Sequence, residues 1–260
     1  MSTPGTILEL PSLRAAESLA RHCLALRAIG VINGPNGTGK TQALKALARH
    51  NSLLPPERIC HYYTAAQAEG SSRGVRDLLI DLEVRQAIHQ RGLALPIALR
   101  LSLREFVDRK IDLILVDEAD LLSSDALRGM VSMFDYASLK GHPIGMMLAG
   151  VKPIDKWIKA LPDGWSRTLK VSRLTNLSVE LTCATFAGWG SPMAELAGKV
   201  KQKDRDAVQL IRAIHRGTGG NLRRLFYFAG LAALDPRPLD AARLRQLMDQ
   251  MTTIPTGDDE

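Results

Sequence analysis

Apolar residues follow two different periods along the chain up to about residue 176. In some segments they recur every three to four positions, which predicts amphipathic helices, and elsewhere they form short runs that barely alternate, which predicts strands buried on both faces. The predicted strands are 28–32, 59–64, 111–116, 143–149 and 168–174. The predicted helices are 13–26 (capped by Ser12), 41–50, 75–89, 101–110, 126–139 and 153–161. Because strands and helices alternate, we expect an α/β fold with a parallel sheet flanked by helices on both sides.

Beyond residue 176 the pattern predicts helices alone. They are expected at 179–189, 192–197, 204–215, 222–234 and 240–251. The sequence therefore predicts an α/β nucleotide-binding core with an N-terminal helix (1–176), a small all-α lid domain (177–252) and a flexible acidic tail (253–260).

Composition narrows the class of protein without naming a function. Hydrophobic residues make up 45% and charged residues 23%, as in ordinary folded proteins. No apolar run approaches the roughly 20 residues of a membrane span, and no signal peptide is visible, so a cytoplasmic protein is expected. The net charge of +7 favours polyanionic partners only weakly. Three isolated cysteines are expected to be reduced and buried: Cys23, Cys60 and Cys183.

A complete phosphate-loop motif lies between the first predicted strand and the next helix. Residues 34–41 read Gly-Pro-Asn-Gly-Thr-Gly-Lys-Thr and match G-x-x-x-x-G-K-[ST]. Glycines let the backbone curl so that its N–H groups face phosphate oxygens, and the helix that follows adds its positive end. We expect Lys40 to reach the terminal phosphates of ATP and the Thr41 hydroxyl to be a Mg²⁺ ligand. The predicted nucleotide contacts are Gly34, Pro35, Asn36, Gly37, Thr38, Gly39, Lys40 and Thr41.

Two adjacent acidic residues directly follow the predicted buried strand 111–116. In P-loop enzymes the first acid at this place holds Mg²⁺, which assigns Asp117, and the second orients and deprotonates the attacking water, which assigns Glu118. Side chains of neighbouring strand residues point to opposite faces, so the two acids can serve different partners only if the chain turns there. Asp120 completes a DEAD tetrapeptide, but without a second α/β domain we interpret it as a helix cap or a supporting acid rather than part of a helicase motif.

Arginines are the further candidates, because hydrolysis needs positive charge on the γ-phosphate. Arg167 precedes the last predicted strand and is the first candidate to act on a neighbouring subunit's nucleotide; Arg173 is the second, and a surface role remains the alternative for both. Arg223 begins a helix after a glycine turn, from which it can contact bound nucleotide. Arg224 is expected to face solvent or another subunit.

These motifs together resemble an AAA+ ATPase. The motifs that carry this resemblance are the phosphate loop, the segment 115–120 (Leu-Val-Asp-Glu-Ala-Asp), Ser166-Arg167 and Gly220–Arg223 (Gly-Asn-Leu-Arg). Within that family, residues 28–41 and the run from 117–123 to 150–154 are similar to the DNA-transposition regulators TnsC, TniB and MuB. The resemblance covers about residues 5–235 in element order. It implies an ATP-dependent homo-oligomer, a ring or helical filament, that assembles on double-stranded DNA. Such an assembly marks a target site and recruits or stimulates a transposase, with or without a target-selection protein. Arg167 of one subunit would then contact the nucleotide of the next.

One segment departs from the AAA+ pattern. A polar sensor residue commonly follows the fourth core strand, but residues 148–151 read Leu-Ala-Gly-Val. Either Lys152 takes part or sensing is reduced, and the resemblance then implies slow hydrolysis that acts as a switch.

Contacts to the DNA backbone need basic residues on exposed loops and helices. Each candidate is individually more typical of a solvated surface residue, and only the set favours DNA. The candidates are Arg73, Arg76, Arg100, Arg104, Arg109, Lys110 and Lys140. A further basic loop, Lys199–Arg205, is expected to face solvent or a partner protein. There are two alternatives to a transposition regulator. One is another AAA+ ATPase that is associated with secretion, or that remodels proteins, and does not act on DNA. The other is a P-loop kinase that acts on small molecules.

Overall fold

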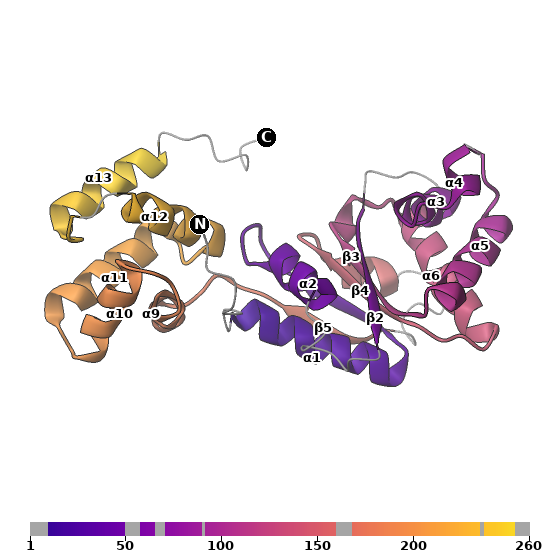
Figure 1. The fold of residues 1–260 in the computed structure, drawn as a ribbon, viewed down its shortest axis with the longest axis horizontal. Helices are drawn as coiled ribbons and strands as arrows, with labels where there is room; N and C mark the ends of the chain where they lie inside the picture. Colours follow the sequence, from indigo (N-terminus) through magenta and orange to yellow (C-terminus); the bar gives the residue numbers. More distant parts are fainter. Residues whose placement is uncertain are drawn as a thin grey trace. The chain divides into compact units, whose positions relative to one another are not determined.

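The computed structural model describes residues 10–49, 58–65, 71–89, 92–159, 168–234 and 237–252. The chain divides into two compact units (Figure 1). Residues 11–36 and 40–174 form the first, which we call the α/β unit, and residues 1–10, 37–39 and 175–260 the second, which we call the helical unit. Arg167 and the predicted tail 253–260 lie outside the described residues.

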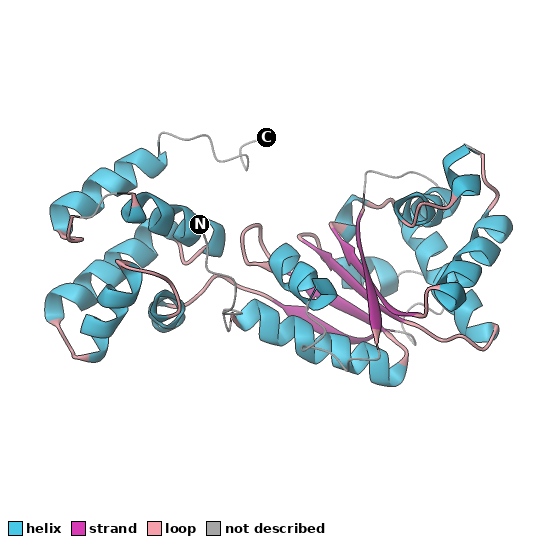
Figure 2. Ribbon diagram, in the orientation of Figure 1, coloured by secondary structure: helices cyan, strands magenta, loops and turns pink. Residues whose placement is uncertain are grey.

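A five-stranded sheet forms the centre of the α/β unit (Figure 2). All its strand pairs are parallel, in the order β2-β3-β4-β1-β5. Each predicted strand is confirmed within two residues at either end. The strands are β1 (Ile29–Asn33), β2 (Ile59–Thr64), β3 (Ile111–Asp117), β4 (Gly145–Gly150) and β5 (Thr168–Arg173). Every residue of β1 and β4 is buried, which explains why their sequences do not alternate.

Helices cover the sheet, and α3, α5 and α6 form a large core with it. Helix α1 packs against α2 and β4, and α3 packs against α5 and α6. Phe106 of α5, with Leu78 and Leu79 of α3, is fully buried in this core. The helices of this unit are α1 (Pro11–Leu26), α2 (Lys40–Arg49), α3 (Ser71–Asp81), α4 (Arg85–His89), α5 (Leu95–Asp108), the 3₁₀ turn η2 (Ala119–Leu121), α6 (Ser124–Leu139) and α7 (Ile154–Lys159).

The predicted single helix 75–89 is wrong, because the chain breaks it into α3 and α4. Glu83 adopts a left-handed conformation with φ 58°. The Val84 N–H donates to the Leu79 carbonyl (2.9 Å) and the Glu83 N–H to the Ile80 carbonyl (2.8 Å). This is the hydrogen-bond pattern of a Schellman motif, formed without its usual glycine. Leu82 and Val84 remain buried through the break, so the apolar spacing continues although the helix does not.

The starts of α1 and α5 also differ from the prediction. Helix α1 begins at Pro11, so Ser12 lies inside the helix, buried, and is not its cap. Helix α5 begins at Leu95, six residues before the predicted start, with Pro96 in its first turn. A proline there costs no hydrogen bond, because the N–H groups of the first turn have no partner within the helix.

The helical unit has its own apolar core. Phe186, Ile211 and Phe228 are buried at its centre. Ser178, Asp204 and Asn221 cap the helices that follow them, each accepting a backbone N–H. The helices are α9 (Val179–Ala187), α10 (Met193–Lys201), α11 (Arg205–Thr218), α12 (Leu222–Ala233) and α13 (Ala241–Thr252). The all-helical prediction is confirmed here, although α10 continues four residues beyond the predicted end.

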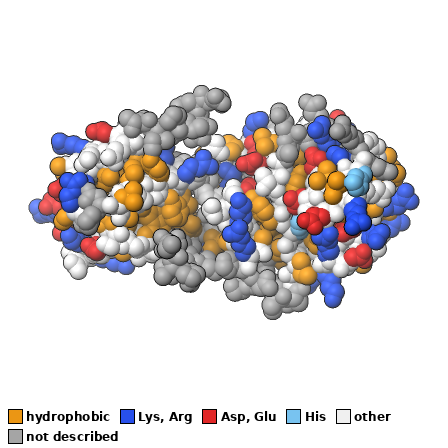
Figure 3. All heavy atoms as spheres, turned by 45° about the horizontal axis from the view of Figure 1, so that its top comes forward, with side chains coloured by type: hydrophobic (Ala, Val, Ile, Leu, Met, Phe, Trp, Pro, Cys, Tyr) orange, Lys and Arg blue, Asp and Glu red, His pale blue; other side chains and the backbone are white. Residues whose placement is uncertain are grey.

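Hydrophobic side chains also gather on the outside of the helical unit (Figure 3). Its large exposed apolar residues are Leu181, Phe226, Tyr227 and Leu234. Phe226 stacks on Trp189 with ring centroids 4.3 Å apart. None of the described helices combines the length and the apolar character that crossing a bilayer would require.

Candidate functional site

The phosphate loop leaves β1 at the carboxyl edge of the sheet. The strands on either side of β1 are β4 and β5, whereas the chain continues to β2 at the far edge, so connections diverge at this point. In parallel α/β sheets, ligands bind at such a switch point. The Gly34 N–H donates to the Gly150 carbonyl (3.2 Å), which fixes the start of the loop to the end of β4. Gly37 and Gly39 have φ angles of 77° and 91°, which side-chain-bearing residues rarely adopt.

Lys40 places a positive charge on the inner side of this loop. The residue is 8% exposed, and its Nζ donates to the Gly34 carbonyl (2.6 Å) and the Pro35 carbonyl (2.9 Å). It begins α2, whose first backbone N–H groups have no partner within the helix. Thr41 follows in the same first turn and is half-buried. A buried ammonium, left-handed glycines and a helix N-terminus at one loop fit a nucleotide phosphate.

The two predicted acids diverge where β3 ends. Asp117 is the last strand residue and is 2% exposed. Glu118 adopts a left-handed conformation (φ 53°, ψ 33°), and its side chain is exposed. The Glu118 N–H donates to Asp117 Oδ1 (3.0 Å). The turn that the different roles of the two acids require is therefore present. Carboxylate and hydroxyl oxygens, as in Asp117 and Thr41, are the donors that Mg²⁺ prefers.

Tyr62 on β2 is a contact of Asp117 that sequence reasoning missed. Its hydroxyl donates to Asp117 Oδ2 (3.0 Å) and accepts from Thr64 Oγ1 (3.1 Å). Burial, opposed by the Thr64 hydrogen bond and reinforced by the charges of Asp117 and Glu118, raises the pKa of Tyr62 to about 12. The hydroxyl is therefore protonated, and able to donate, at neutral pH. No motif contains this tyrosine; the only signal is its place on the strand next to β3.

Asp120 joins the turn after β3 to the end of β4. Its Oδ1 accepts the Val151 N–H (3.1 Å). A Cβ at Gly150 would lie 2.2 Å from the same oxygen, so the carboxylate fills the space beside that glycine. Asp120 therefore acts as a supporting acid and not as a helix cap, since Ser123 caps α6. The end of β4 carries no polar side chain at 148–151, as the sequence indicates, and Lys152 is exposed.

Two of the arginine candidates, Arg223 and Arg173, lie among the described residues, and both are exposed. Arg223 is exposed at the second position of α12, three residues after the left-handed Gly220, which agrees with its predicted place at the start of a helix that follows a glycine turn. The Leu177 N–H donates to the Gly220 carbonyl (2.9 Å), which fixes this turn within the helical unit. Arg173 ends β5 and is exposed.

The basic residues predicted to contact DNA are all exposed except Arg76, which is half-buried. Four of them contact neighbours within the α/β unit. Arg76 is half-buried beside Asp77, Arg104 pairs with Asp108, Arg109 donates to the Leu82 carbonyl and to Glu105, and Lys140 lies over the Tyr136 ring.

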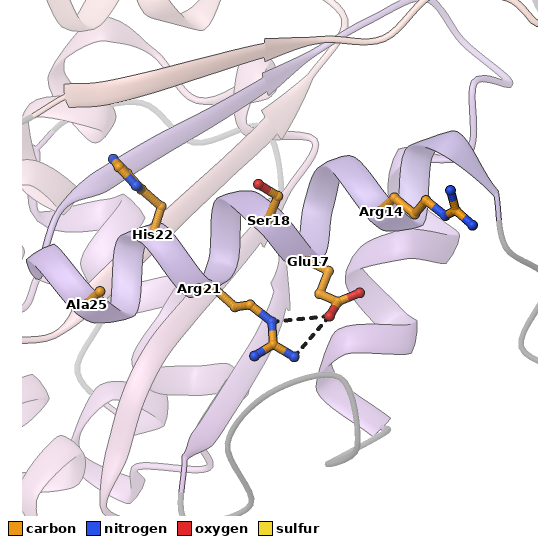
Figure 4. A pocket seen from close by; sticks show the side chains of 6 residues that line it. All are labelled: Arg14, Glu17, Ser18, Arg21, His22 and Ala25. Carbon is orange, nitrogen blue, oxygen red and sulfur yellow. Dashed lines mark hydrogen bonds and ion pairs between the residues drawn. The ribbon is translucent and has the colours of Figure 1, made fainter.

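A separate hollow lies along α1 (Figure 4). Its volume is about 550 Å³, and all six lining residues come from that one helix. Arg21 is bound there to Glu17 through Nε (3.1 Å) and Nη2 (2.9 Å). No residue of the predicted site lines this hollow, so it adds nothing to the chemistry of the phosphate loop.

Comparison with known proteins identifies the family. A family model described as an AAA domain matches residues 24–158, which is just over half of the 260-residue chain. The chain therefore belongs to the AAA domain family, whose members are P-loop ATPases that generally bind nucleotide with Mg²⁺, and this membership supports ATPase activity. No curated protein matches the sequence closely enough to count as a relative.

Solved structures share the fold at low sequence identity. Cdc6p from Pyrobaculum aerophilum aligns with a TM-score of 0.54 and 18% identity over 85% of this chain and 66% of its own length, so this chain spans just under two thirds of Cdc6p. The ORC2 protein of Aeropyrum pernix, solved as ADPNP–ADP complexes, gives 0.63 and 15% over 98% and 71%. Domain III of the replication initiation protein DnaA from Thermotoga maritima gives 0.56 and 14% over 97% and 95%.

Proposed function

We propose that this chain is an ATP-dependent, DNA-binding regulator of transposition. In this proposal it assembles with ATP on double-stranded DNA as a ring or helical filament, marks the target site and recruits or stimulates a transposase. The observation that carries the proposal is the complete phosphate loop at the same sheet edge as the diverging Asp117 and Glu118. Membership of the AAA domain family supports the ATPase part, and the motif resemblance to TnsC, TniB and MuB supports the transposition part.

Each site residue has a proposed task in ATP hydrolysis. Lys40 and the loop N–H groups bind the phosphates, and Thr41 and Asp117 hold Mg²⁺, which when bound neutralises charge on the phosphate oxygens. The exposed Glu118 orients the attacking water and accepts its proton. Arg167 of the neighbouring subunit and Arg223 contact the nucleotide from outside the loop. Without a polar side chain at 148–151, we expect turnover to be slow, so that the ATP state lasts long enough to serve as a switch.

Charge and surface character support the two kinds of partner. The net charge of +7 favours a polyanion, and the exposed basic candidates for phosphate contacts are Arg73, Arg100, Arg104, Arg109, Lys110 and Lys140. Such contacts follow the backbone and give little sequence preference. The exposed apolar residues of the helical unit, among them Phe226 and Tyr227, are typical of a surface that another protein covers, which supports a homo-oligomer.

Electron microscopy and sedimentation of the full chain with duplex DNA test the proposal. With Mg²⁺ and a slowly hydrolysed ATP analogue we expect rings or filaments on DNA, and monomers without nucleotide. Lys40→Ala should abolish nucleotide binding and assembly together. Glu118→Gln should keep ATP binding and assembly but lower turnover by about 100-fold or more, because it removes only the base.

The outcomes separate the proposal from its main alternative. DNA affinity should fall steeply with salt, since phosphate contacts release counterions. An ATPase that oligomerises with nucleotide yet binds no duplex at any salt concentration would instead be an AAA ATPase acting on protein. The transposition role requires that the DNA-bound assembly stimulate strand transfer by a transposase encoded beside this chain; an assembly without that effect would contradict it.

A further inference from the structure

Tyr62 and Thr64 lie on the same face of β2, because strand residues two apart share a face. The parallel register pairs Tyr62 with Leu115 and Thr64 with Asp117. The backbone of Tyr62 therefore lies opposite Leu115, two residues before Asp117. The long tyrosine side chain extends along the strand direction, so that its hydroxyl reaches the Asp117 carboxylate. A shorter side chain at position 62 would not reach. Thr64, directly opposite Asp117, contacts the tyrosine hydroxyl instead of the acid.

These contacts give the Asp117 carboxylate one orientation. Oδ2 accepts from the Tyr62 hydroxyl (3.0 Å), and Oδ1 accepts from the Glu118 N–H (3.0 Å). The Tyr62 hydroxyl is itself oriented, because it accepts from Thr64 and so directs its own hydrogen to Asp117. A carboxylate oxygen has lone pairs for more than one partner, so both oxygens can still accept from water bound to a metal ion.

The tyrosine ring also contacts the helix that follows the phosphate loop. Lys45 of α2 lies with its Nζ 5.6 Å from the centre of the Tyr62 ring, and α2 packs against both β2 and β3. The helix that begins with Lys40 and Thr41 and the strand that ends with Asp117 therefore meet on either side of Tyr62. One side chain links the two elements that carry the predicted Mg²⁺ ligands.

We propose that Tyr62 is a positioning residue that orients Asp117 toward Mg²⁺ and thereby sets how much Mg²⁺ the nucleotide complex needs. The proposal rests on the proposed role of Asp117 as a Mg²⁺ ligand and is independent of DNA assembly. Partners that hydrogen-bond a metal-binding carboxylate fix its direction, and losing one typically weakens metal affinity by about 10–100-fold. Tyr62→Phe removes the hydroxyl alone and keeps the ring over which Lys45 lies.

The test measures binding of a fluorescent ATP analogue to the full chain, without DNA, as Mg²⁺ is varied. In EDTA, Tyr62→Phe and the natural chain should bind the analogue equally, since Lys40 and the loop are unchanged. The Mg²⁺ concentration at half-maximal enhancement of binding should rise by about 10–100-fold in Tyr62→Phe. Thr64→Val, which only loosens the tyrosine hydroxyl, should shift it in the same direction by less. Tyr136→Phe on α6 is the matched control and should shift nothing.

The Asp117→Asn variant makes the outcomes distinguishable. If Asp117→Asn leaves the Mg²⁺ requirement unchanged, the assignment of Asp117 fails, and with it the basis of this proposal. If Asp117→Asn raises the requirement and Tyr62→Phe does not, the role of Tyr62 alone is refuted. Tyr62→Phe should add no further shift to Asp117→Asn, because it acts through that carboxylate. Electron paramagnetic resonance of Mn²⁺ in its place should show weaker binding to the Tyr62→Phe nucleotide complex, and equal binding would also overturn the proposal.

Discussion

Glu118 shows how one backbone conformation separates two neighbouring acids. Asp117 ends an extended strand and is buried, whereas Glu118, at φ 53°, directs its carboxylate into solvent. A left-handed conformation without glycine costs on the order of 1 kcal/mol or more and persists only when the surrounding structure enforces it. Here the Glu118 N–H is bound by Asp117 and its carbonyl accepts the Leu121 N–H (2.9 Å). This strained residue is where we place the catalytic base.

At the residue scale, the surroundings of Cys60 on β2 predict a slowly reacting thiol. Burial, reinforced by the charge of Asp112, raises the pKa of its thiol from 9.0 to about 12. At pH 8 only about one molecule in ten thousand then carries the reactive thiolate. We expect iodoacetamide to modify Cys60 very slowly in the folded chain and quickly in denaturant, as followed by mass spectrometry. Rapid modification of the folded chain would contradict the raised pKa of this half-buried thiol.

The raised pKa of Cys60 also predicts the direction in which the free energy of unfolding changes with pH. Between pH 9 and about 12 the unfolded chain releases the Cys60 proton before the folded chain does. The free energy of unfolding should therefore fall as pH rises through this window, with no contribution from Cys60 below it.

At the scale of elements, Asp112 connects the amino ends of three strands, at the end of the sheet opposite the candidate site. Near the start of β3, its Oδ1 accepts from Arg58 (2.7 Å), directly before β2, and from Arg27 (3.3 Å), shortly before β1. The carboxylate is 17% exposed, so these contacts are partly shielded from water. One acid thus aligns the first residues of three strands whose other ends carry the candidate site.

Replacing Asp112 tests this alignment. Asp112→Ala should lower the free energy of unfolding by about 1–3 kcal/mol, because it leaves two partly buried arginines without their carboxylate. Asp108→Ala is the matched control, since its pair with Arg104 is exposed (60% and 72%) and worth less than about 1 kcal/mol. Urea unfolding of both variants measures the difference, and equal losses would contradict a structural role for Asp112.

At the scale of elements, the sequence predicts well those features that depend only on residues close together in the chain. Buried runs such as 111–116 predict strands, and the phosphate loop depends only on neighbouring residues. The break at Glu83 was missed because the apolar spacing continues across it. The contact of Tyr62 with Asp117 was missed because it depends on strand order and register, which bring together residues 55 positions apart. Asp120 likewise depends on the position of β4, 31 residues away along the chain.

At the scale of the whole molecule, the two units have separate cores. Phe106, Ile114 of β3 and Leu148 of β4 belong to one, and Phe186 and Phe228 to the other. The change from alternating strands and helices to helices alone predicts a domain boundary near residue 176, and the helical unit includes the chain from residue 175 on. Because each core closes on itself, a loss of packing in one need not open the other.

Hydrogen exchange of a core variant tests this independence. Phe228→Ala should cost about 3–5 kcal/mol within the helical unit. Exchange should therefore accelerate in α9–α13 and stay unchanged in β3 and β4. Leu234→Ala is the control, because Leu234 is 83% exposed and should change neither. Equal acceleration in both units would mean that the chain unfolds as one cooperative body.

The contact between Asp120 and Gly150 restricts how this site can evolve. Introducing asparagine, serine or threonine at position 150 would press a new side-chain carbon against the Asp120 oxygen, 2.2 Å away. Removing the acid alone would free the Val151 N–H that it binds. Both single steps disturb this contact, so we expect substitutions at the two positions to be coupled. A side chain at 150 should be tolerated better when the acid at 120 is also replaced, and comparing the stability of Gly150→Ser, Asp120→Ala and the double variant measures this coupling.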